Sequence, residues 1–505
     1  MKTDYKKISL LSMLGLASQL VPAQTPNIVL VLADDLGYGD VSCLNPESKI
    51  RTPFIDSLSR NGILFSDAHA SSSLSTPSRY SLMTGRYSWR TTLKQGVYDG
   101  YSGPMIDEGR RTVASMLSDC GYSTACIGKW HLGWDWTLKD NAKGPKDVDY
   151  SRPVTHGVTD RGGFDYFYGI SASLDMPPYV YVENDMPTAV PDRKSSRMTG
   201  LKLFRSGPIA PDFKPEDCLG HFFRKAIEYV DSRKDSDAPF FLYLPLTAPH
   251  TPILPADEYQ GKTPVGPYGD FVVMVDDLLR TLVDTLRKNG QWDNTLFIFT
   301  SDNGCAPYID IPELERQGHY PSHVFRGAKT DIYEGGHRIP LIVNYGDRLI
   351  PRVDKSLVSL TDIYATFADI VDYKMGAEEG EDSYSIWKLI LGKGKSSRRD
   401  LVSLSGKGYF ALRDREQKLI FWYGSGGQSY PKHPDDYSKN LPQMQLYDLQ
   451  SDISESRNLV DMPRNRSLLR RLTSRMRRYV DDGRSTPGRK QNNDTDNNWE
   501  QTKLF

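Results

Sequence analysis

The sequence predicts an α/β fold with a large, mostly parallel central sheet flanked by helices and a smaller C-terminal α+β unit. Three observations support this prediction. Apolar runs of strand length alternate with segments in which apolar residues recur at helical spacing. Two of the best runs end in carboxylates, and ligands bind at the carboxyl ends of parallel strands. After about residue 395 the pattern changes to short strands followed by one arginine-rich helix.

The strands predicted for the main sheet are continuous apolar runs, as expected for strands buried on both faces. In chain order they are Ile28–Ala33, Phe240–Leu244, Thr295–Thr300 and Ile339–Val343. The first strand is followed by Asp34 and Asp35, and the third leads through Ser301 into Asp302 and Asn303. Carboxyl ends of parallel strands meet at one edge, so these oxygen-bearing side chains are expected to lie together.

Helices are predicted between these strands from apolar residues at spacings of three and four. The predicted helical stretches are Val113–Leu117, Leu219–Val230 and Val272–Leu286. Asn289 and Gly290 follow the last of them and are typical of a helix C-terminus.

The C-terminal α+β unit is predicted from a hairpin, a further strand and a helix. The hairpin joins Tyr409–Arg413 to Lys418–Trp422, and the further strand is Gln445–Asp448. A helix is predicted over Leu468–Met476, with its apolar residues facing inward and its arginines facing outward. The expected division is 24–395 for the catalytic domain, 396–483 for this unit and 484–505 for a polar tail, which composition alone predicts to be disordered.

Charge and the N-terminus restrict the classes of protein that the sequence can encode. The formal net charge is −1, without the basic excess that binding to nucleic-acid phosphates usually requires. Lys2, Lys6 and Lys7 precede the apolar stretch Ile8–Val21, and small residues then lead to Ala23. This pattern predicts a signal peptide of residues 1–23, cleaved after Ala23, and a periplasmic or secreted protein with no membrane span.

Five cysteines are sparse for a chain of this length, and they are Cys43, Cys120, Cys126, Cys218 and Cys305. None forms a Cys-x-x-Cys pair, which argues against a zinc ribbon or a thioredoxin-like site. We interpret them as buried thiols, and the sequence leaves open whether two form a disulfide.

The segment Ser75–Arg86 has the sequence Ser-Thr-Pro-Ser-Arg-Tyr-Ser-Leu-Met-Thr-Gly-Arg. It resembles the signature of type I sulfatases, Ser/Cys-x-Pro-Ser-Arg followed by Leu-(Leu/Met)-Thr-Gly-(Arg/Lys), at every defining position. The resemblance extends over nearly the whole chain after the signal peptide and implies an alkaline-phosphatase-like sandwich. In that family the first residue of the signature is oxidised to formylglycine (3-oxoalanine). The serine form of the signature implies that a radical maturation enzyme of the anaerobic bacterial kind modifies Ser75 before export.

The chemistry of sulfate esters explains why such a residue is useful. A plain serine would give an enzyme sulfate that is itself slow to hydrolyse. A hydrated aldehyde supplies two hydroxyls, one to attack sulfur and one to expel sulfate as the carbonyl re-forms, so one difficult step becomes two easier ones. The alternative is a purely structural role, in which Ser75 or Ser78 caps a helix.

A metal site is predicted from the residues at the strand ends. Their oxygen donors, without sulfur or imidazole, select a hard cation such as calcium or magnesium. The resemblance implies one calcium ion held by Asp34, Asp35, Asp302 and Asn303, with residue 75 completing the shell.

Further motifs supply the cationic groups that a sulfate site needs. Gly128–Gly133, Pro249–Pro252, Arg326–Lys329 and Glu334–Pro340 match other boxes of the family. The resemblance implies that Arg79 and Lys129 hold the aldehyde hydrate, and that His131 assists sulfate release. Lys129, His250 and Lys329 would bind the substrate's sulfate, with His250 also protonating the leaving oxygen.

Two softer segments resemble those of bacterial arylsulfatase-like enzymes. Asp175 could hydrogen-bond a sugar hydroxyl, although a plain loop role is equally compatible with the sequence. Arg484–Gly488 also recurs near the C-terminus of that group, which favours a packed tail over a disordered one.

The sequence therefore predicts an exo-acting hydrolase of O-sulfate on galactose-type or N-acetylgalactosamine-type sugars of host or algal glycans. One alternative is a phosphodiesterase or phosphonate hydrolase of the same superfamily, although ligands for only one metal are apparent. The other is a non-catalytic protein that binds sulfated glycans, which would apply if Ser75 stays unmodified.

Overall fold

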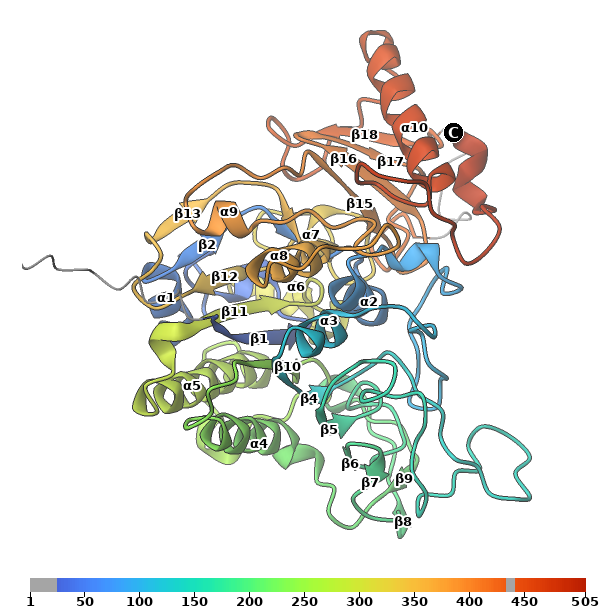
Figure 1. Cartoon of the computed structure of the whole chain (residues 1–505). Helices are drawn as coiled ribbons and strands as arrows, with labels where there is room; N and C mark the ends of the chain where they lie inside the picture. Colours follow the sequence, from blue (N-terminus) through green and yellow to red (C-terminus); the bar gives the residue numbers. More distant parts are fainter. Residues whose placement is uncertain (1–24, 433–440) are drawn as a thin grey trace, which may run out of the picture.

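The computed structural model describes residues 25–432 and 441–505 (Figure 1). The predicted signal peptide lies outside the described residues. No helix within the described ranges is both long and apolar enough to cross a membrane.

A ten-stranded mixed sheet forms the centre of the molecule, in the order β13-β2-β12-β11-β1-β10-β4-β5-β6-β7. Its five middle strands are all parallel. They are β11 (Thr295–Ser301), β1 (Asn27–Asp34), β10 (Phe240–Pro249), β4 (Ser123–Lys129) and β5 (Tyr166–Ile170). The outer strands are β13 (Arg352–Asp354), β2 (Ile63–Phe65), β12 (Leu341–Asn344), β6 (Val182–Glu183) and β7 (Met186–Pro187).

The strand predictions are confirmed with one difference in direction. Strands β1, β10 and β11 contain the predicted runs, and β12 begins two residues later than predicted and pairs antiparallel with both β11 and β2. Near the end of β11 and again before β12, the chain contacts Asp35 at the carboxyl edge of the sheet, through Asp302 and Lys329. Strand β12 therefore starts beside the end of β11 and runs back along it, without the crossover that a parallel neighbour requires.

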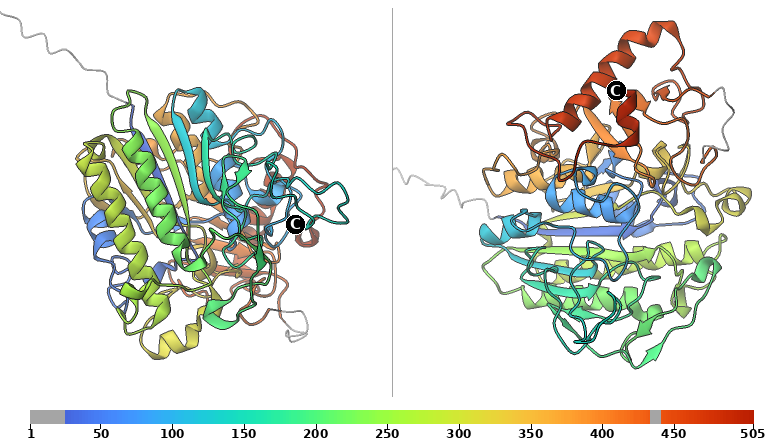
Figure 2. Two further views of the ribbon diagram at one scale, coloured as in Figure 1. Left: turned by 90° about the horizontal axis from the view of Figure 1, so that it is seen from below. Right: turned by 90° about the vertical axis from the view of Figure 1, so that its right-hand side faces the viewer.

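Helices cover both faces of the sheet, and the alternation of side chains along β1 assigns the two cores. Val29 and Val31 belong to the core with α1 (Pro53–Arg60), α4 (Cys218–Ser232) and α5 (Pro267–Lys288). Ile28 and Leu30 belong to the core with α2 (Ser75–Thr84), α3 (Val113–Asp119) and α8 (Ile363–Ile370). Figures 1 and 2 show α4 and α5 together on one face and α2, α3 and α8 on the other.

The C-terminal unit is an antiparallel sheet packed against one helix, as predicted, and it contains a fourth strand, β15, that was not predicted (Figure 1). The strands are β15 (Asp400–Leu404), β16 (Phe410–Asp414), β17 (Gln417–Ile420) and β18 (Gln445–Asp448), and the helix is α10 (Arg466–Asp481). Leu472 and Met476 of α10 are fully buried against this sheet. The opposite face packs on Ile332 and Tyr333 of the catalytic domain.

The smaller elements connect these layers. They are β3 (Ala68–His69), β14 (Val358–Ser359), β8 (Arg193–Lys194), β9 (Pro208–Ile209), α6 (Ile311–Arg316), α7 (Glu334–His337) and α9 (Trp387–Ile390). All five cysteines are free thiols, and Cys120 is exposed rather than buried.

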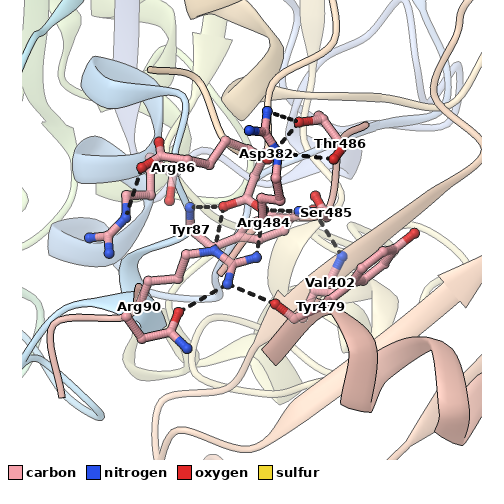
Figure 3. A network of polar contacts seen from close by, with 12 residues as sticks. Arg86, Tyr87, Arg90, Asp382, Val402, Tyr479, Arg484, Ser485 and Thr486 are labelled. Atoms are coloured by element: carbon pink, nitrogen blue, oxygen red, sulfur yellow. Dashed lines mark hydrogen bonds and ion pairs between the residues drawn. The ribbon is translucent and has the colours of Figure 1, made fainter. Parts of the chain in front are cut away.

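The polar segment 484–505 packs on the rest of the chain. This agrees with the packed tail that the Arg484–Gly488 resemblance favours and differs from the disorder that composition alone predicts. Figure 3 shows how Asp382 joins this segment to the catalytic domain. Its Oδ1 accepts a 2.9 Å hydrogen bond from the Ser485 amide, and both oxygens accept 2.8 Å bonds from Arg90. Arg86 donates to both carboxylate oxygens of Asp494 at 2.9 Å. Polar residues can be ordered in this way when buried charges supply their partners.

Candidate functional site

The predicted site residues meet at the carboxyl edge of the parallel strands, beside the start of α2. Strand β1 ends at the two adjacent aspartates, β11 leads into Asp302 and Asn303, and β4 ends at Lys129. Hydrogen bonds and ion pairs link all of them into one buried network, together with Ser75, Arg79, His131, His250 and Lys329. The catalytic and metal-site predictions thus fall in one place.

Ser75 is the first residue of α2 and does not cap that helix. The N-cap position is Leu74, and the hydroxyl of Ser78 donates to the carbonyl of Ser72. The Ser75 Oγ instead accepts a 2.7 Å hydrogen bond from Arg79 Nε and lies 3.1 Å from His131 Nδ1. The residue is 1% exposed. A serine held between a guanidinium and an imidazole, rather than at a helix cap, is placed for chemistry.

Two of the oxygen donors of the site lack a hydrogen-bond partner, although Arg79 lies 3.6 Å from one of them. Asp34 Oδ1 and Asn303 Oδ1 are buried, and neither has a hydrogen-bond partner among the described residues. Buried polar atoms are normally paired because leaving them unpaired costs free energy. A hard cation would satisfy both oxygens at once, so the residues present fit the calcium site predicted from the sequence.

The carboxylates are kept charged by neighbouring cations. Burial alone would raise the pKa of Asp34, but Lys129, His250 and Arg79 together hold it below its usual value. Burial acts on Asp35 in the same way, and Lys329 and His250 lower its pKa. Both residues are thus anionic donors at neutral pH.

Three buried cations balance the three carboxylates. Lys129 Nζ lies 2.6 Å from Asp34 Oδ2, Lys329 Nζ lies 2.8 Å from Asp35, and Arg79 contacts Asp302 Oδ2 at 2.7 Å. With this balance, a divalent cation and an anionic ester could enter together without a large excess of charge.

His131 is a neutral acceptor beside Ser75. Burial and the nearby charges of Lys129 and Arg79 hold its pKa well below the ordinary histidine value. Its Nε2 lies 2.8 Å from the carbonyl of Tyr98, which can only accept, so Nε2 carries the proton. The free lone pair is therefore on Nδ1, which faces the Ser75 hydroxyl.

His250 has the opposite arrangement, with its Nδ1 lying 2.6 Å from the carbonyl of Thr251 and therefore protonated. Its Nε2 faces the site, 3.1 Å from Tyr308 Oη and 3.6 Å from Asp35 Oδ2. Lys329 Nζ also contacts Tyr308 Oη, at 3.1 Å. Sequence reasoning missed Tyr308; its position five residues after Asn303, in the loop that leaves a site strand, was the available signal.

Asp175 is buried at the side of this network. It is 2% exposed, its Oδ2 pairs with Arg205, and its Oδ1 is buried without a hydrogen-bond partner in the described chain. Ser173, two residues earlier, accepts a 2.9 Å hydrogen bond from Lys129 and connects this loop to the site. Arg205 was not foreseen, because it belongs to no motif. Ser173 lies in the segment around Asp175 that resembles bacterial arylsulfatase-like enzymes, but no role was predicted for it.

Known proteins of one family are similar to this chain. The family model described as Sulfatase matches residues 26–373. An N-acetylgalactosamine-6-O-sulfatase of Bacteroides thetaiotaomicron is 33% identical over 477 residues, covering 86% of this chain and 90% of that protein. Human arylsulfatase A is 30% identical over 471 residues, covering 89% and 86% of the two chains.

A solved structure from Bacteroides thetaiotaomicron is also similar to this chain. It is described under the metabolism of multiple glycosaminoglycans by that organism, and it superposes with a TM-score of 0.78 at 30% identity. The match covers 90% of this chain and 99% of the other.

Proposed function

The chain belongs to the sulfatase family of sulfuric ester hydrolases, and we propose that it removes O-sulfate from galactose-type or N-acetylgalactosamine-type sugars with formylglycine at position 75 and one calcium ion. The observation that carries the proposal is the position of Ser75. Its hydroxyl lies between Arg79 and His131, next to two buried oxygens that lack partners.

Conversion of Ser75 to formylglycine by a radical maturation enzyme is part of this proposal. The serine form of the signature supports it. A serine hydroxyl free of any capping role also supports it, because oxidation at this position removes no bond that holds the helix together. Modification would precede export to the periplasm or the outside of the cell.

Calcium would be held by Asp34, Asp35, Asp302 and Asn303 together with residue 75. Bound there, the ion would supply positive charge against the sulfate oxygens and the oxygen of residue 75. The two unpartnered oxygens of Asp34 and Asn303 support this assignment.

The side chains around residue 75 have separable roles. Arg79 orients the attacking oxygen, because its Nε already donates to that atom. Lys129 and Lys329 bind sulfate oxygens and stabilise the charge that builds on them. His131 accepts a proton from a residue-75 hydroxyl through Nδ1, the ring nitrogen that carries no proton.

His250 would protonate the leaving sugar oxygen. Its Nδ1 proton is committed to the Thr251 carbonyl, so the proton to be donated must reside on Nε2. The ring is then an imidazolium, which Asp35 at 3.6 Å stabilises. Sugar alkoxides are poor leaving groups and require this proton.

The substrate assignment rests on the relatives and on one ion pair. The N-acetylgalactosamine-6-O-sulfatase relative supports sulfate at the 6-position of an N-acetylgalactosamine or galactose ring. The Asp175–Arg205 pair offers an acceptor and a donor on adjacent groups, suited to a pair of ring hydroxyls. Asp175 Oδ1 is buried without a hydrogen-bond partner among the described residues. This supports a role for that oxygen as the acceptor of a hydrogen bond from a substrate hydroxyl.

Release of sulfate from a panel of singly sulfated sugars tests the proposal. The matured protein should act on 6-sulfated N-acetylgalactosamine or galactose more rapidly than on the 3-sulfated and 4-sulfated isomers, and Ser75→Ala should release none. Binding of these sugars without turnover by the matured protein would instead support the non-catalytic alternative. Turnover of phosphodiesters in preference to sulfate esters would place the activity in the other branch of the superfamily.

A further inference from the structure

A cleft of about 700 Å³ opens beside the Asp175–Arg205 pair. Its walls come from the loop after β4, from the segment around β8 and β9, and from Tyr101 and Pro177. Figure 1 shows these segments together at the end of the molecule remote from α10.

Residues that neighbour the Asp175–Arg205 pair in the chain line the cleft. Pro177 follows Asp175 by two residues, and Ser206 and Gly207 directly follow Arg205. On its other wall Tyr101 is three residues from Tyr98, whose carbonyl binds His131. A sugar held by the Asp175–Arg205 pair therefore has this cleft as the adjacent space.

The cleft carries more positive than negative charge. Lys139, Lys146 and Lys194 line it, are exposed, and form no ion pair with any residue that the structure describes. Arg193 is paired with Asp192 at 2.9 Å, and Asp149, the other carboxylate of the lining, interacts with the charge of Lys139. The charges of Lys146 and Lys194 are then left over, and they favour an anionic occupant.

The cleft also presents aromatic surface. Tyr101 and Tyr150 are half-buried on its walls, and Lys146 Nζ lies 5.7 Å from the Tyr101 ring centroid. Tyrosine rings offer a flat apolar face with a polar edge, which suits the C–H face of a sugar ring. Rings and free ammonium groups together match an acidic sugar.

We infer that this cleft binds the next sugars of an oligosaccharide substrate and prefers those that carry a carboxylate or a second sulfate. This inference rests on the proposed function, because it takes the sulfated sugar at the Asp175–Arg205 pair as the starting point. It makes the substrate an acidic glycan chain with the scissile sulfate on its terminal sugar, rather than a free monosaccharide.

Three substrates with the same terminal sugar test the inference. They are 6-sulfated N-acetylgalactosamine alone, the same sugar linked to a neutral sugar, and the same sugar at the non-reducing end of a chondroitin oligosaccharide, where the next sugar is a uronate. The uronate-linked substrate should have kcat/KM higher than the other two by about fivefold to tenfold, mainly through KM. Added salt should remove this preference, since the lysines are exposed.

Variants then assign the preference to the cleft. The double variant Lys146→Ala with Lys194→Ala should lose the preference for the uronate-linked substrate and keep the rate on the monosaccharide. Lys143→Ala is the matched control, because Lys143 is exposed on the same loop and does not line the cleft.

Two results would overturn the inference while leaving the proposed function intact. One is equal kcat/KM for the three substrates. The other is an unchanged preference in the double lysine variant. Failure of the proposed function is distinguishable, because none of the three substrates would then release sulfate.

Discussion

Arg79 Nε donates a 2.7 Å hydrogen bond to the Oγ of Ser75, four residues earlier on the same helix. The same guanidinium binds Asp302 Oδ2 at 2.7 Å and the carbonyl of Lys129 at 3.2 Å. One side chain thus fixes the position of residue 75 relative to Asp302, a proposed calcium ligand, and to the end of β4. Helical spacing makes this possible, because residues four apart lie on one face.

Arg79→Lys should retain the fold and lose most of the activity. Lysine keeps the positive charge but cannot contact Ser75 and Asp302 simultaneously through a planar fork. We expect kcat/KM to fall by about 10²-fold to 10³-fold, measured as sulfate release by protein whose Tm is checked in parallel. The control is Arg316→Lys, an exposed arginine on α6. Full activity of Arg79→Lys would show that the guanidinium geometry is dispensable.

Calcium should stabilise the protein as well as support its activity. The ion would satisfy the oxygens of Asp34 and Asn303 that have no hydrogen-bond partner. The unfolded chain does not hold these oxygens together, so calcium would bind the folded state selectively. At a hundredfold excess over Kd the gain is about 3 kcal/mol, seen as a rise in Tm. Chelation should lower both Tm and activity, and Asn303→Ala should abolish the response to calcium. A Tm of the wild-type protein that is indifferent to calcium would argue against the site.

His250→Ala should affect substrates according to their leaving group. A sugar alkoxide needs a proton as it leaves, whereas a nitrophenolate does not. The rate on the sugar sulfate should therefore fall by about 10²-fold to 10⁴-fold, and the rate on 4-nitrophenyl sulfate by much less. Steady-state kinetics on the two substrates measure this difference. An equal loss on both would assign His250 to sulfate binding alone.

Asp67 should make the free energy of unfolding depend on pH in the acid range. Burial opposes its ionisation, but Arg413 holds its pKa well below the usual range through bonds of 2.8 and 2.7 Å. Since the pKa is lower in the folded state, the stabilisation is complete above the unfolded-state pKa of about 4 and is lost as pH falls below it.

Asp67→Asn tests this prediction. At pH 7 the substitution leaves a buried Arg413 short of its partner and should cost about 3 kcal/mol in the free energy of unfolding. As pH falls below about 4 the difference between variant and wild type should shrink, and it should vanish only as pH approaches the depressed folded-state pKa of Asp67. Denaturant unfolding across pH measures both effects, with the exposed Asp369→Asn as control. Parallel pH profiles for variant and wild type would contradict the assignment.

The sheet and the main site could be predicted because each depends on local sequence. Apolar runs identified β1, β10 and β11, and the carboxylates after β1 and β11 identified the edge of the sheet where the candidate site lies. The signature around Ser75 and the boxes with Lys129, His250 and Lys329 gave the rest. These residues are recognisable without knowing which loops meet in space.

Other features depend on contacts between distant segments and had no local signal. Tyr308 acquires its role only because its loop folds over His250 and Lys329. Arg205 matters through Asp175, thirty residues earlier. The tail was misjudged from composition because its partners, Arg86, Arg90 and Asp382, lie hundreds of residues away.

The mass of the peptide that contains Ser75, measured together with sulfate release, tests the central claim most directly. Protein co-expressed with a serine-type maturation enzyme should carry residue 75 lighter by two hydrogens and should release sulfate in proportion to the modified fraction. Protein made without that enzyme should keep the serine mass and show little turnover. Equal activity of the two preparations, with Ser75 unmodified in both, would contradict the account.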